Sequence, residues 1–414
     1  MFLTNDAPTP KGWRKILSFN WFLLALVCIA VGIGLIMLYG VANGDPKEWM
    51  IPQAQRFALG LFLMFFIAFT PMKLWQYASI PIYVSTLLLL VYTVFFGETG
   101  GGAARWVSLG PLRIQPSEFA KVAVVLILAN YYAVLPSNKK SNPIFMIPAI
   151  LLIIIPAVLV VVQPDLGTAL FIVLIGIGIM FLAGVHWAYY AAGLFAGAVV
   201  IVSVGVGLFF YEPENTCKAE QTPYPNWLVS ISESSMGGQL RIAAEWAIKP
   251  YQYDRIFTFV HPECDPKGDG WQITQGKIAL GAGGMNGAGF MKGTQSRLNF
   301  LSENHTDFIF TSYAENFGYV GTIFLLCIFG LMSFVISTLS VINNSRYGSM
   351  VIGGLGILIF LFYMINLAMV MGLMPVVGVP LPFISYGGSA MLVLCISIGF
   401  IQNAHIHRPR KVKQ

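Results

Sequence analysis

The stretch of this sequence best equipped for chemistry is HPECDPKGDGWQITQGK, residues 261–277, which holds Asp265, Asp269 and Lys277 in a chain that is only 10% charged. The surrounding region, residues 212–307, contains eleven of the eighteen acids, eight bases and several aromatic residues. A carboxylate in such a setting can act as a general base, and lysine or arginine can stabilise developing negative charge. This mixture suits a surface that handles anionic, sugar-bearing substrates.

Two cofactor sites that this region superficially resembles are excluded. In DPKGDG, Lys267 stands at the third position of a calcium loop and Gly276 at the twelfth, so two sets of oxygen ligands are missing. In GAGGMNGAG, Asn286 stands where a dinucleotide fingerprint has its third glycine, and no parallel sheet accompanies it. We interpret this glycine-rich stretch as a flexible turn against a membrane, because glycine is the usual residue of tight backbone paths.

Charged residues also occur inside or beside long apolar runs, where a charge is costly and usually functional. QPSEFAKV carries Glu118 and Lys121, which are three residues apart on one helical face and can neutralise each other. QPDLGT places Asp165 at the start of a run, where a carboxylate suits the helix dipole. HTDFIF places Asp307 in a first turn, and Glu315 lies about two turns deeper.

For each of these positions, a structural cap or a buried ion pair is an alternative explanation. All of them nevertheless approach the same side of the membrane, beneath the acid-rich region. We therefore predict one outward-facing polar cavity.

The elements that must position these residues are membrane-spanning helices. The hydrophobic fraction is 57% and mean hydropathy is +0.73, concentrated in runs of about twenty residues, the length that spans a bilayer. The runs are continuously apolar, which favours helices over barrel strands. We predict an all-α polytopic membrane protein of about ten spans: 21–40, 56–75, 77–96, 117–135, 144–162, 167–184, 188–210, 308–338, 350–373 and 386–404.

Lysine and arginine gather in every second connection and in both tails, which predicts that both termini are cytoplasmic. The chain then divides into a cytoplasmic tail (1–20), seven helices (21–210), an extracytoplasmic loop (211–307), three helices (308–404) and a basic tail (405–414). The net charge of +6 lies largely on inner segments that can meet anionic membrane lipids. No soluble basic domain exists to bind nucleic acid.

The long loop between the seventh and eighth helices is too apolar for a disordered linker. RIAAEWAI, residues 241–248, is typical of a short amphipathic helix at the membrane interface. We predict a folded cap over the outer mouth of the bundle. Cys217 and Cys264 both lie in this loop, so an oxidising compartment would allow a disulfide between them, with free thiols as the equal alternative.

Six motifs in order make the sequence resemble the SEDS family of shape, elongation, division and sporulation proteins. These are QPSEFAKV, QPDLGT, KPYQYDRI, PECDPKGDGWQITQGKIALGAGG, LSENHTDFIF and GLMPVVGVPLPFISYGGS, between about residues 100 and 390. The segment PVVGVPLPFISYGG is similar to the rod-shape branch, whereas the division branch more often has a lysine there. Residues 211–238 depart from the family by being longer than its usual connection.

The resemblance implies ten helices in the bacterial cytoplasmic (inner) membrane. It implies a peptidoglycan glycosyltransferase that polymerises lipid II, releases undecaprenyl pyrophosphate, serves cell-wall elongation and rod shape, and has a class B penicillin-binding protein as partner. The family's essential aspartate before proline corresponds to Asp265, as general base or as the group that orients the acceptor. The expected substrate-binding residues are Glu118, Lys121, Arg105, Lys249, Arg255, Asp165, His305, Asp307 and Ser385.

Within this set, basic side chains would hold the pyrophosphate, and Glu118 would position Lys121. A divalent cation, Mg²⁺ or Mn²⁺, is another way to stabilise the negative charge on the leaving pyrophosphate. No organic cofactor is expected. Trp106 and Trp271 would stack on sugars or anchor at the interface. Asp269, flanked by glycines, is expected to be only a turn residue.

Two other classes of function compete with the transferase. A lipid II flippase or related transporter would bind its substrate at the membrane midplane, often between repeats, and this chain shows no repeat. A non-catalytic scaffold would explain the spans without explaining the polar cavity.

Overall fold

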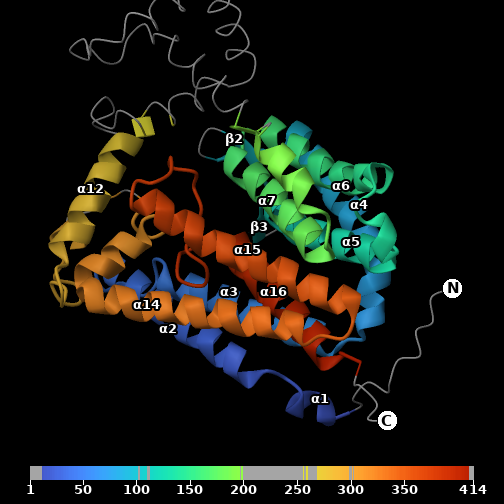
Figure 1. The fold of residues 1–414 in the computed structure, drawn as a ribbon. Coiled ribbons are helices and arrows are strands. Elements are labelled where there is room, and N and C mark those ends of the chain that lie inside the picture. The colour runs from blue at the N-terminus through green and yellow to red at the C-terminus, as the bar shows by residue number, and fades with distance from the viewer. Residues whose placement is uncertain are drawn as a thin grey trace, which may run out of the picture.

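The structure is a computed structural model that describes residues 12–100, 103–109, 112–195, 197–198, 255, 258–259, 268–297, 301 and 303–409. Asp265, Lys249, Cys217 and Cys264 lie outside these residues, as does the helix predicted at 241–248. Within the described part, the chain forms a bundle of long helices (Figure 1).

The elements follow one another along the chain as α1 (Arg14–Leu17), α2 (Trp21–Val41), α3 (Met50–Phe69), α4 (Met72–Phe96), β1 (Glu98–Gly100), β2 (Ala103–Leu109), β3 (Leu112–Ile114), α5 (Pro116–Val134), the 3₁₀ helix η1 (Ser137–Lys139), α6 (Pro143–Val162), α7 (Leu166–Ala183), α12 (Asp269–Ala282), α13 (Thr294–Arg297), α14 (Ile309–Val341), α15 (Arg346–Val370) and α16 (Gly388–Ile406).

Nine helices among the described residues are long and apolar enough to cross a membrane, namely α2 to α7 and α14 to α16. They correspond to nine of the predicted spans and confirm an all-α polytopic membrane protein. Residues 187–195 are helical where the predicted seventh span of 188–210 begins, and most of that span lies outside the described residues.

The predicted second span is misplaced at both ends. The second span was expected at 56–75, but α3 runs from Met50 to Phe69. The predicted span began after the polar residue Gln53, yet Gln53 is buried inside the protein. Its amide donates to the Ser385 carbonyl at 2.9 Å and its oxygen accepts from the Gly387 amide, so the polar cost of burial is compensated by hydrogen bonds.

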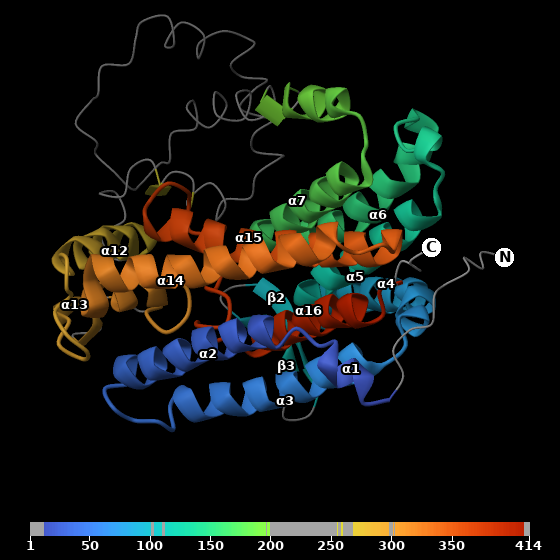
Figure 2. The ribbon, with the colours of Figure 1, turned by 60° about the horizontal axis from the view of Figure 1, so that its bottom comes forward.

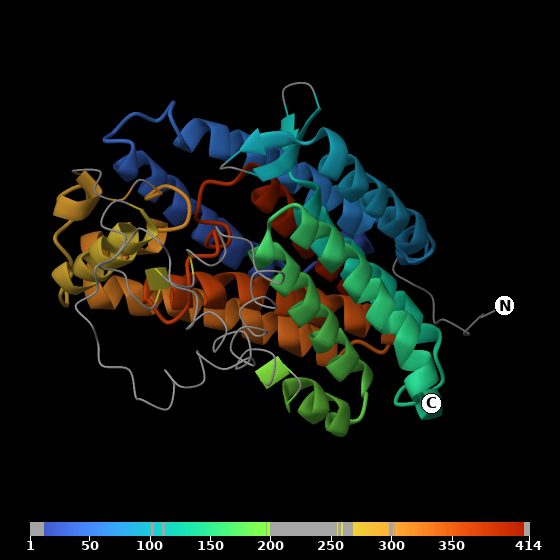
Figure 3. The ribbon, with the colours of Figure 1, turned by 90° about the horizontal axis from the view of Figure 1, so that it is seen from above.

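Helix α5 is in contact with α4, α6, α7, α15 and α16, and Figure 3 shows the green helices α6 and α7 running side by side in the same part of the bundle. Its residues from Ala120 to Ala129 are buried without interruption. A helix that other helices surround in this way faces protein on all sides and does not face lipid. The charged residues at its start are therefore held inside protein, not in hydrocarbon.

The helices alternate in direction, so the bundle has two distinct ends. One end carries the sheet and α12, together with the starts of α5, α7, α14 and α16. The other end carries α1 and the end of α16, and Figure 2 shows it opposite α12 and α13. All the sequence motifs with charged residues inside spans therefore lie at the α12 end.

A small antiparallel sheet, β1-β2-β3, stands at the α12 end between α4 and α5. Val107 pairs with Ile114, and Glu98 pairs with Trp106 across an irregular register. The sequence analysis predicted no strands in the chain. Two of these strands have three residues each, too few for the two-residue alternation that identifies a strand.

Candidate functional site

The pair predicted between Glu118 and Lys121 is present at the start of α5. The Lys121 ammonium lies 2.6 Å from a Glu118 carboxylate oxygen, and the two side chains are 2% and 9% exposed. Lys121 also lies over the rings of Phe362 and Phe171, at 4.2 and 5.0 Å. The second Glu118 oxygen and the Ser117 hydroxyl are buried without a hydrogen-bond partner among the described residues. The start of α5 thus has polar capacity left to bind a ligand.

The motif residue Asp165 caps α7, as its position suggested. Its carboxylate accepts from the Thr168 amide at 3.2 Å and from the Thr168 hydroxyl at 2.9 Å. It also accepts from the Gln115 amide group at 3.1 Å, which joins the two proline-containing motifs directly. Arg105 donates to the carbonyls of Gln163 and Pro164 just before this cap. Asp165 and Arg105 therefore position the α6–α7 turn.

The connection between α15 and α16, residues 371–387, joins the remaining motifs. The Ser385 hydroxyl accepts from the Leu381 amide and donates to the Thr306 carbonyl at 2.6 Å. Asn366 in α15 donates to the Asp307 carbonyl at 2.8 Å and to the Val379 carbonyl at 2.7 Å.

Just after this connection, in the first turn of α16, the Ser389 hydroxyl accepts from the Gln115 backbone amide at 2.9 Å. At the centre of the connection, an added Cβ on Gly167 would lie 2.7 Å from the Val377 carbonyl oxygen. This loop and the start of α16 thus touch the segments that carry Glu118, Asp165 and Asp307, and the bundle assembles them at one end.

Beside this loop lies a cluster of rings that includes the predicted residue His305, whereas the sequence analysis missed its other members. Trp49 stacks on His305 with ring centroids 4.0 Å apart, and Tyr386 meets Trp49 edge-on at 4.7 Å. The Arg56 guanidinium lies 4.4 Å from the centre of the Tyr386 ring, and its Nη1 is buried without a hydrogen-bond partner among the described residues. Burial lowers the pKa of His305, partly offset by nearby glutamates. The available signal was an arginine almost two turns inside an apolar helix, and the predicted span placed it at the very start instead.

Part of the predicted cap is described, and it is built differently from the expectation. Residues 269–282 form α12, with Gly268 before it, so Asp269 begins a helix where only a turn was expected. The glycine-rich residues after α12 are not a loose turn, because they bond to the α14 backbone. Ala288 donates to the Glu315 carbonyl at 2.9 Å, and Tyr319 donates to the Gly284 carbonyl at 2.8 Å.

This docking coincides with a break in α14, where Gly318 has φ +64° and ψ −163°. Only residues without a Cβ allow the two backbones to approach so closely: a Cβ on Gly287 would lie 2.2 Å from the Asn316 carbonyl oxygen. Residues 293–295, farther along the chain, cover the buried Glu315 carboxylate, which accepts from the Gln295 backbone amide at 2.8 Å. Glu315 is thus closed off beneath the cap.

The remaining predicted residues are placed only in part. Arg255 is half-buried. Trp271 is partly exposed on α12, and Trp106 on β2 lies under the Arg113 guanidinium at 5.3 Å. Cys28, Cys327 and Cys395 are free thiols. The bridge between Cys217 and Cys264 stays a prediction: denatured, unreduced protein should show three reactive thiols of the five in the chain, and five would contradict it.

Comparison with known proteins identifies the family to which this helical bundle belongs. The model of the cell cycle protein family of the FtsW, RodA and SpoVE type matches residues 16–217 and 224–410. The chain belongs to this family. It is 34% identical to the peptidoglycan glycosyltransferase MrdB of Escherichia coli K12 over 97% of this chain and 98% of that one. It is 29% identical to the peptidoglycan glycosyltransferase RodA of Treponema pallidum, over 94% and 98% of the two chains.

Solved structures show the same fold for this family member. A chain of a peptidoglycan synthase complex described as coordinating polymerization and crosslinking is 27% identical, with a TM-score of 0.74 over 94% of this chain and 98% of that one. The rod shape determining protein RodA of Thermus thermophilus is 24% identical, with a TM-score of 0.66 over 95% and 99% of the two chains. The family therefore shares this helical bundle at low sequence identity.

Proposed function

We propose that this protein is a peptidoglycan glycosyltransferase that polymerises lipid II in the bacterial inner membrane, for cell-wall elongation and rod shape. The observation that carries the proposal is the 34% identity to a peptidoglycan glycosyltransferase across 97% of the chain. The assembly of charged motifs at one end of the bundle supports it. The names of the relatives give no support to the alternative of a lipid II flippase.

The reaction joins a sugar 4-hydroxyl of the acceptor to the anomeric carbon of an α-linked pyrophosphate donor, with inversion. The new bond forms between the acceptor oxygen and the anomeric carbon, and the bond from that carbon to the pyrophosphate breaks. The hydroxyl proton needs a base, which we assign to Asp265. The pyrophosphate leaves with the bonding electron pair, so it needs nearby positive charge.

Two buried or half-buried cations at the α12 end suit that second task. Lys121 is held by Glu118 inside the bundle, and Arg56 keeps a donor unused by the described protein. Lys249 and Arg255 complete our set of phosphate-binding residues, and His305 and Asp307 line the same end. Because the hydrogen bonds of Asp165, Arg105 and Ser385 run within the protein, we assign these three to positioning the motifs.

A divalent cation belongs to the proposal as a companion of the pyrophosphate, whose own oxygens supply ligands for Mg²⁺ or Mn²⁺. The described residues contain no group of three or more His, Cys, Asp or Glu side chains that could hold a metal ion. We therefore derive no step through a protein-bound metal.

The proposed partner is a class B penicillin-binding protein, since a similar chain comes from a complex that coordinates polymerization and crosslinking. We propose that the α12 end faces the periplasm and both termini face the cytoplasm. The described lysines and arginines at the α1 end, with no acid among them, support this orientation.

The test is a gel assay of glycan polymer made from purified lipid II. Wild type, Asp265→Asn and the local control Asp269→Asn are compared with and without the partner and a divalent cation, with the partner's transpeptidase blocked by a β-lactam. We expect polymer from wild type and Asp269→Asn, and a loss of about 10²- to 10⁴-fold in Asp265→Asn. The reverse pattern would refute our assignment of the base. No polymer from any variant, with labelled lipid II crossing liposome bilayers, would favour the transporter.

A further inference from the structure

The α1 end of the bundle is cationic without carboxylates among its described residues. Every acidic residue that the structure describes lies toward the α12 end, whereas lysine or arginine occurs in α1, at the start of α4, around η1, at the start of α15 and at Arg408. Two of these cations bind helix carbonyls: Lys15 donates to Phe69 and Lys140 to Ala183, at 2.8 and 2.7 Å. An anionic headgroup at this end would therefore meet no repelling carboxylate among the described residues.

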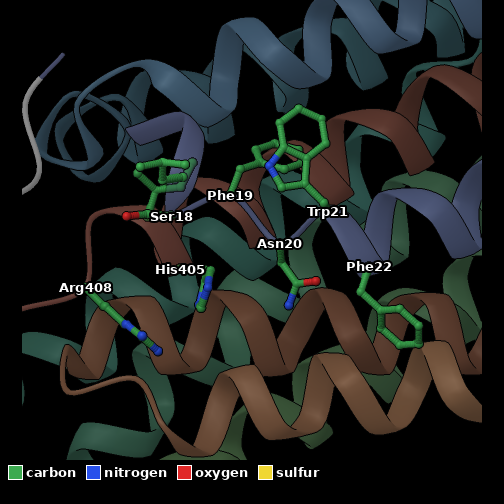
Figure 4. Close-up of a pocket in the computed structure, with 9 residues that line it drawn as sticks. Ser18, Phe19, Asn20, Trp21, Phe22, His405 and Arg408 are labelled. Atoms are coloured by element: carbon green, nitrogen blue, oxygen red, sulfur yellow. The ribbon is translucent and has the colours of Figure 1, made fainter. Parts of the chain in front are cut away.

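A pocket of about 500 Å³ opens at this end, between the α1–α2 link and the end of α16. Figure 4 shows Ser18, Asn20, His405 and Arg408 around it. Two hydrogen bonds hold its walls together. The Asn20 backbone N–H donates to the Gln402 side-chain oxygen at 3.0 Å, and the Gln402 side-chain nitrogen donates to the Asn20 backbone carbonyl at 2.9 Å. Gln402 is fully buried, so the pocket has a fixed base.

His405 and Arg408 are the basic residues that line this pocket. The His405 Nδ1 atom is buried and has no hydrogen-bond partner among the described residues, although buried ring nitrogens normally have one. Arg408 lines the same pocket with a guanidinium, whose donors match the oxygens of a phosphate. The Ser18 hydroxyl, by contrast, already donates to the Arg14 carbonyl.

The rim of the pocket places it at the level of lipid headgroups. Trp21 and Phe22 line it and are 50% and 53% exposed, and Trp21 keeps its indole N–H bonded to the Ile16 carbonyl. Exposed aromatic residues at helix ends typically lie at the membrane–water interface. Trp13 and Leu17 of α1 are also exposed, which extends the apolar rim.

We propose that this pocket binds the phosphate of an anionic phospholipid, with Arg408 pairing with the phosphate and the His405 ring lining the site beside it. The acyl chains then run along the exposed face of α2, beside Phe22. Basic pockets between helices on the cytoplasmic side are a known way of binding anionic headgroups. The lipid would anchor the α1–α2 link to α16 through its negatively charged headgroup. This site is independent of the transferase chemistry at the opposite end.

Native mass spectrometry of the full-length protein tests the proposal, with dioleoyl-phosphatidylglycerol as the probe, dioleoyl-phosphatidylcholine as the uncharged-headgroup control and inorganic phosphate as a competitor. Arg408→Gln should weaken phosphatidylglycerol retention about five-fold, the effect of one basic residue at an anionic surface. His405→Gln should weaken it too, and Arg408→Lys should largely retain it. Arg346→Gln removes a cation from the same end outside the pocket and should not change retention.

Equal losses in Arg408→Gln and Arg346→Gln would overturn the proposal, because retention would then reflect general surface charge. Binding of inorganic phosphate that depends on Arg408, without preference for phosphatidylglycerol over phosphatidylcholine, would overturn the lipid assignment and identify a soluble-phosphate site. Thermal unfolding in lipid-free detergent verifies that each variant is folded. Wild-type preference for phosphatidylglycerol over phosphatidylcholine supplies a readout that needs no variant, and its absence also refutes the proposal.

Discussion

The ion pair between Glu118 and Lys121 allows structure and catalysis to be separated by removing one charge or both. Glu118→Gln leaves the Lys121 ammonium buried without its carboxylate, and Lys121→Met leaves the carboxylate without its ammonium. The double variant removes both charges and keeps the volume roughly constant. Removing one partner of a buried pair is strongly destabilising, whereas replacing both is often neutral or stabilising.

The expected size follows from the burial of the pair. With the side chains 2% and 9% exposed and the charged atoms 2.6 Å apart, solvent screens the interaction little, so each single change should cost about 3 to 5 kcal/mol of unfolding free energy. An unfolding entropy of about 2.1 cal/mol/K per residue over the 414-residue chain corresponds to about 0.9 kcal/mol/K. The melting temperature should therefore fall by about 3 to 6 °C.

Thermal unfolding and the polymer assay on the same four proteins provide the two readouts. We expect Glu118→Gln and Lys121→Met to lose stability and activity, and the double variant to regain stability but not activity. The contacts of Lys121 with the Phe362 and Phe171 rings should make Glu118→Gln the milder of the two single changes. Unchanged melting temperatures in both single variants would refute the buried pair. Full activity in the double variant would show that the charges serve the fold alone.

Three further perturbations test other parts of the α12 end. Gly287→Ala should lower the melting temperature and the activity, because φ at this residue is +79° and the added Cβ would meet the α14 backbone. The control Gly281→Ala meets nothing within 4 Å and should be neutral or stabilising. Equal effects of the two changes would contradict the docking of this segment on α14. Arg56→Met should slow polymerisation about 10²- to 10³-fold. The control Arg113→Met removes an exposed cation at the same end and should have little effect. Initial rates of polymerisation test both expectations. Burial lowers the pKa of His305, so the unfolded state binds more protons than the folded state below the ordinary histidine pKa of about 6.5. The free energy of unfolding should therefore fall as the pH drops through that range. His305→Gln should lose this part of the dependence of stability on pH, and identical pH dependence in wild type and variant would refute the prediction.

Local patterns in the sequence were enough for most of the architecture. Runs of about twenty apolar residues identified nine of the helices, because the bilayer sets their length whatever their neighbours are. The spacing of three between Glu118 and Lys121 predicted their contact, because helix geometry alone brings such residues together. The cap formed by Asp165 was likewise readable from its place at a helix start.

Contacts between distant segments were decided only by the tertiary structure. Three such contacts join residues that are dozens to hundreds of positions apart. They are the hydrogen bond from Gln115 to Asp165, the stacking of Arg56 over Tyr386 and the hydrogen bond from Ser385 to the Thr306 carbonyl. No periodicity encodes such pairs, because they depend on how whole helices pack. The same holds for the glycines after α12, which looked like a flexible turn until the α14 backbone was seen lying against them. The sequence by itself determined the membrane-spanning helices and the charges that they carry. Packing between helices decided which of those charges meet, since each is held by partners that lie far away along the chain.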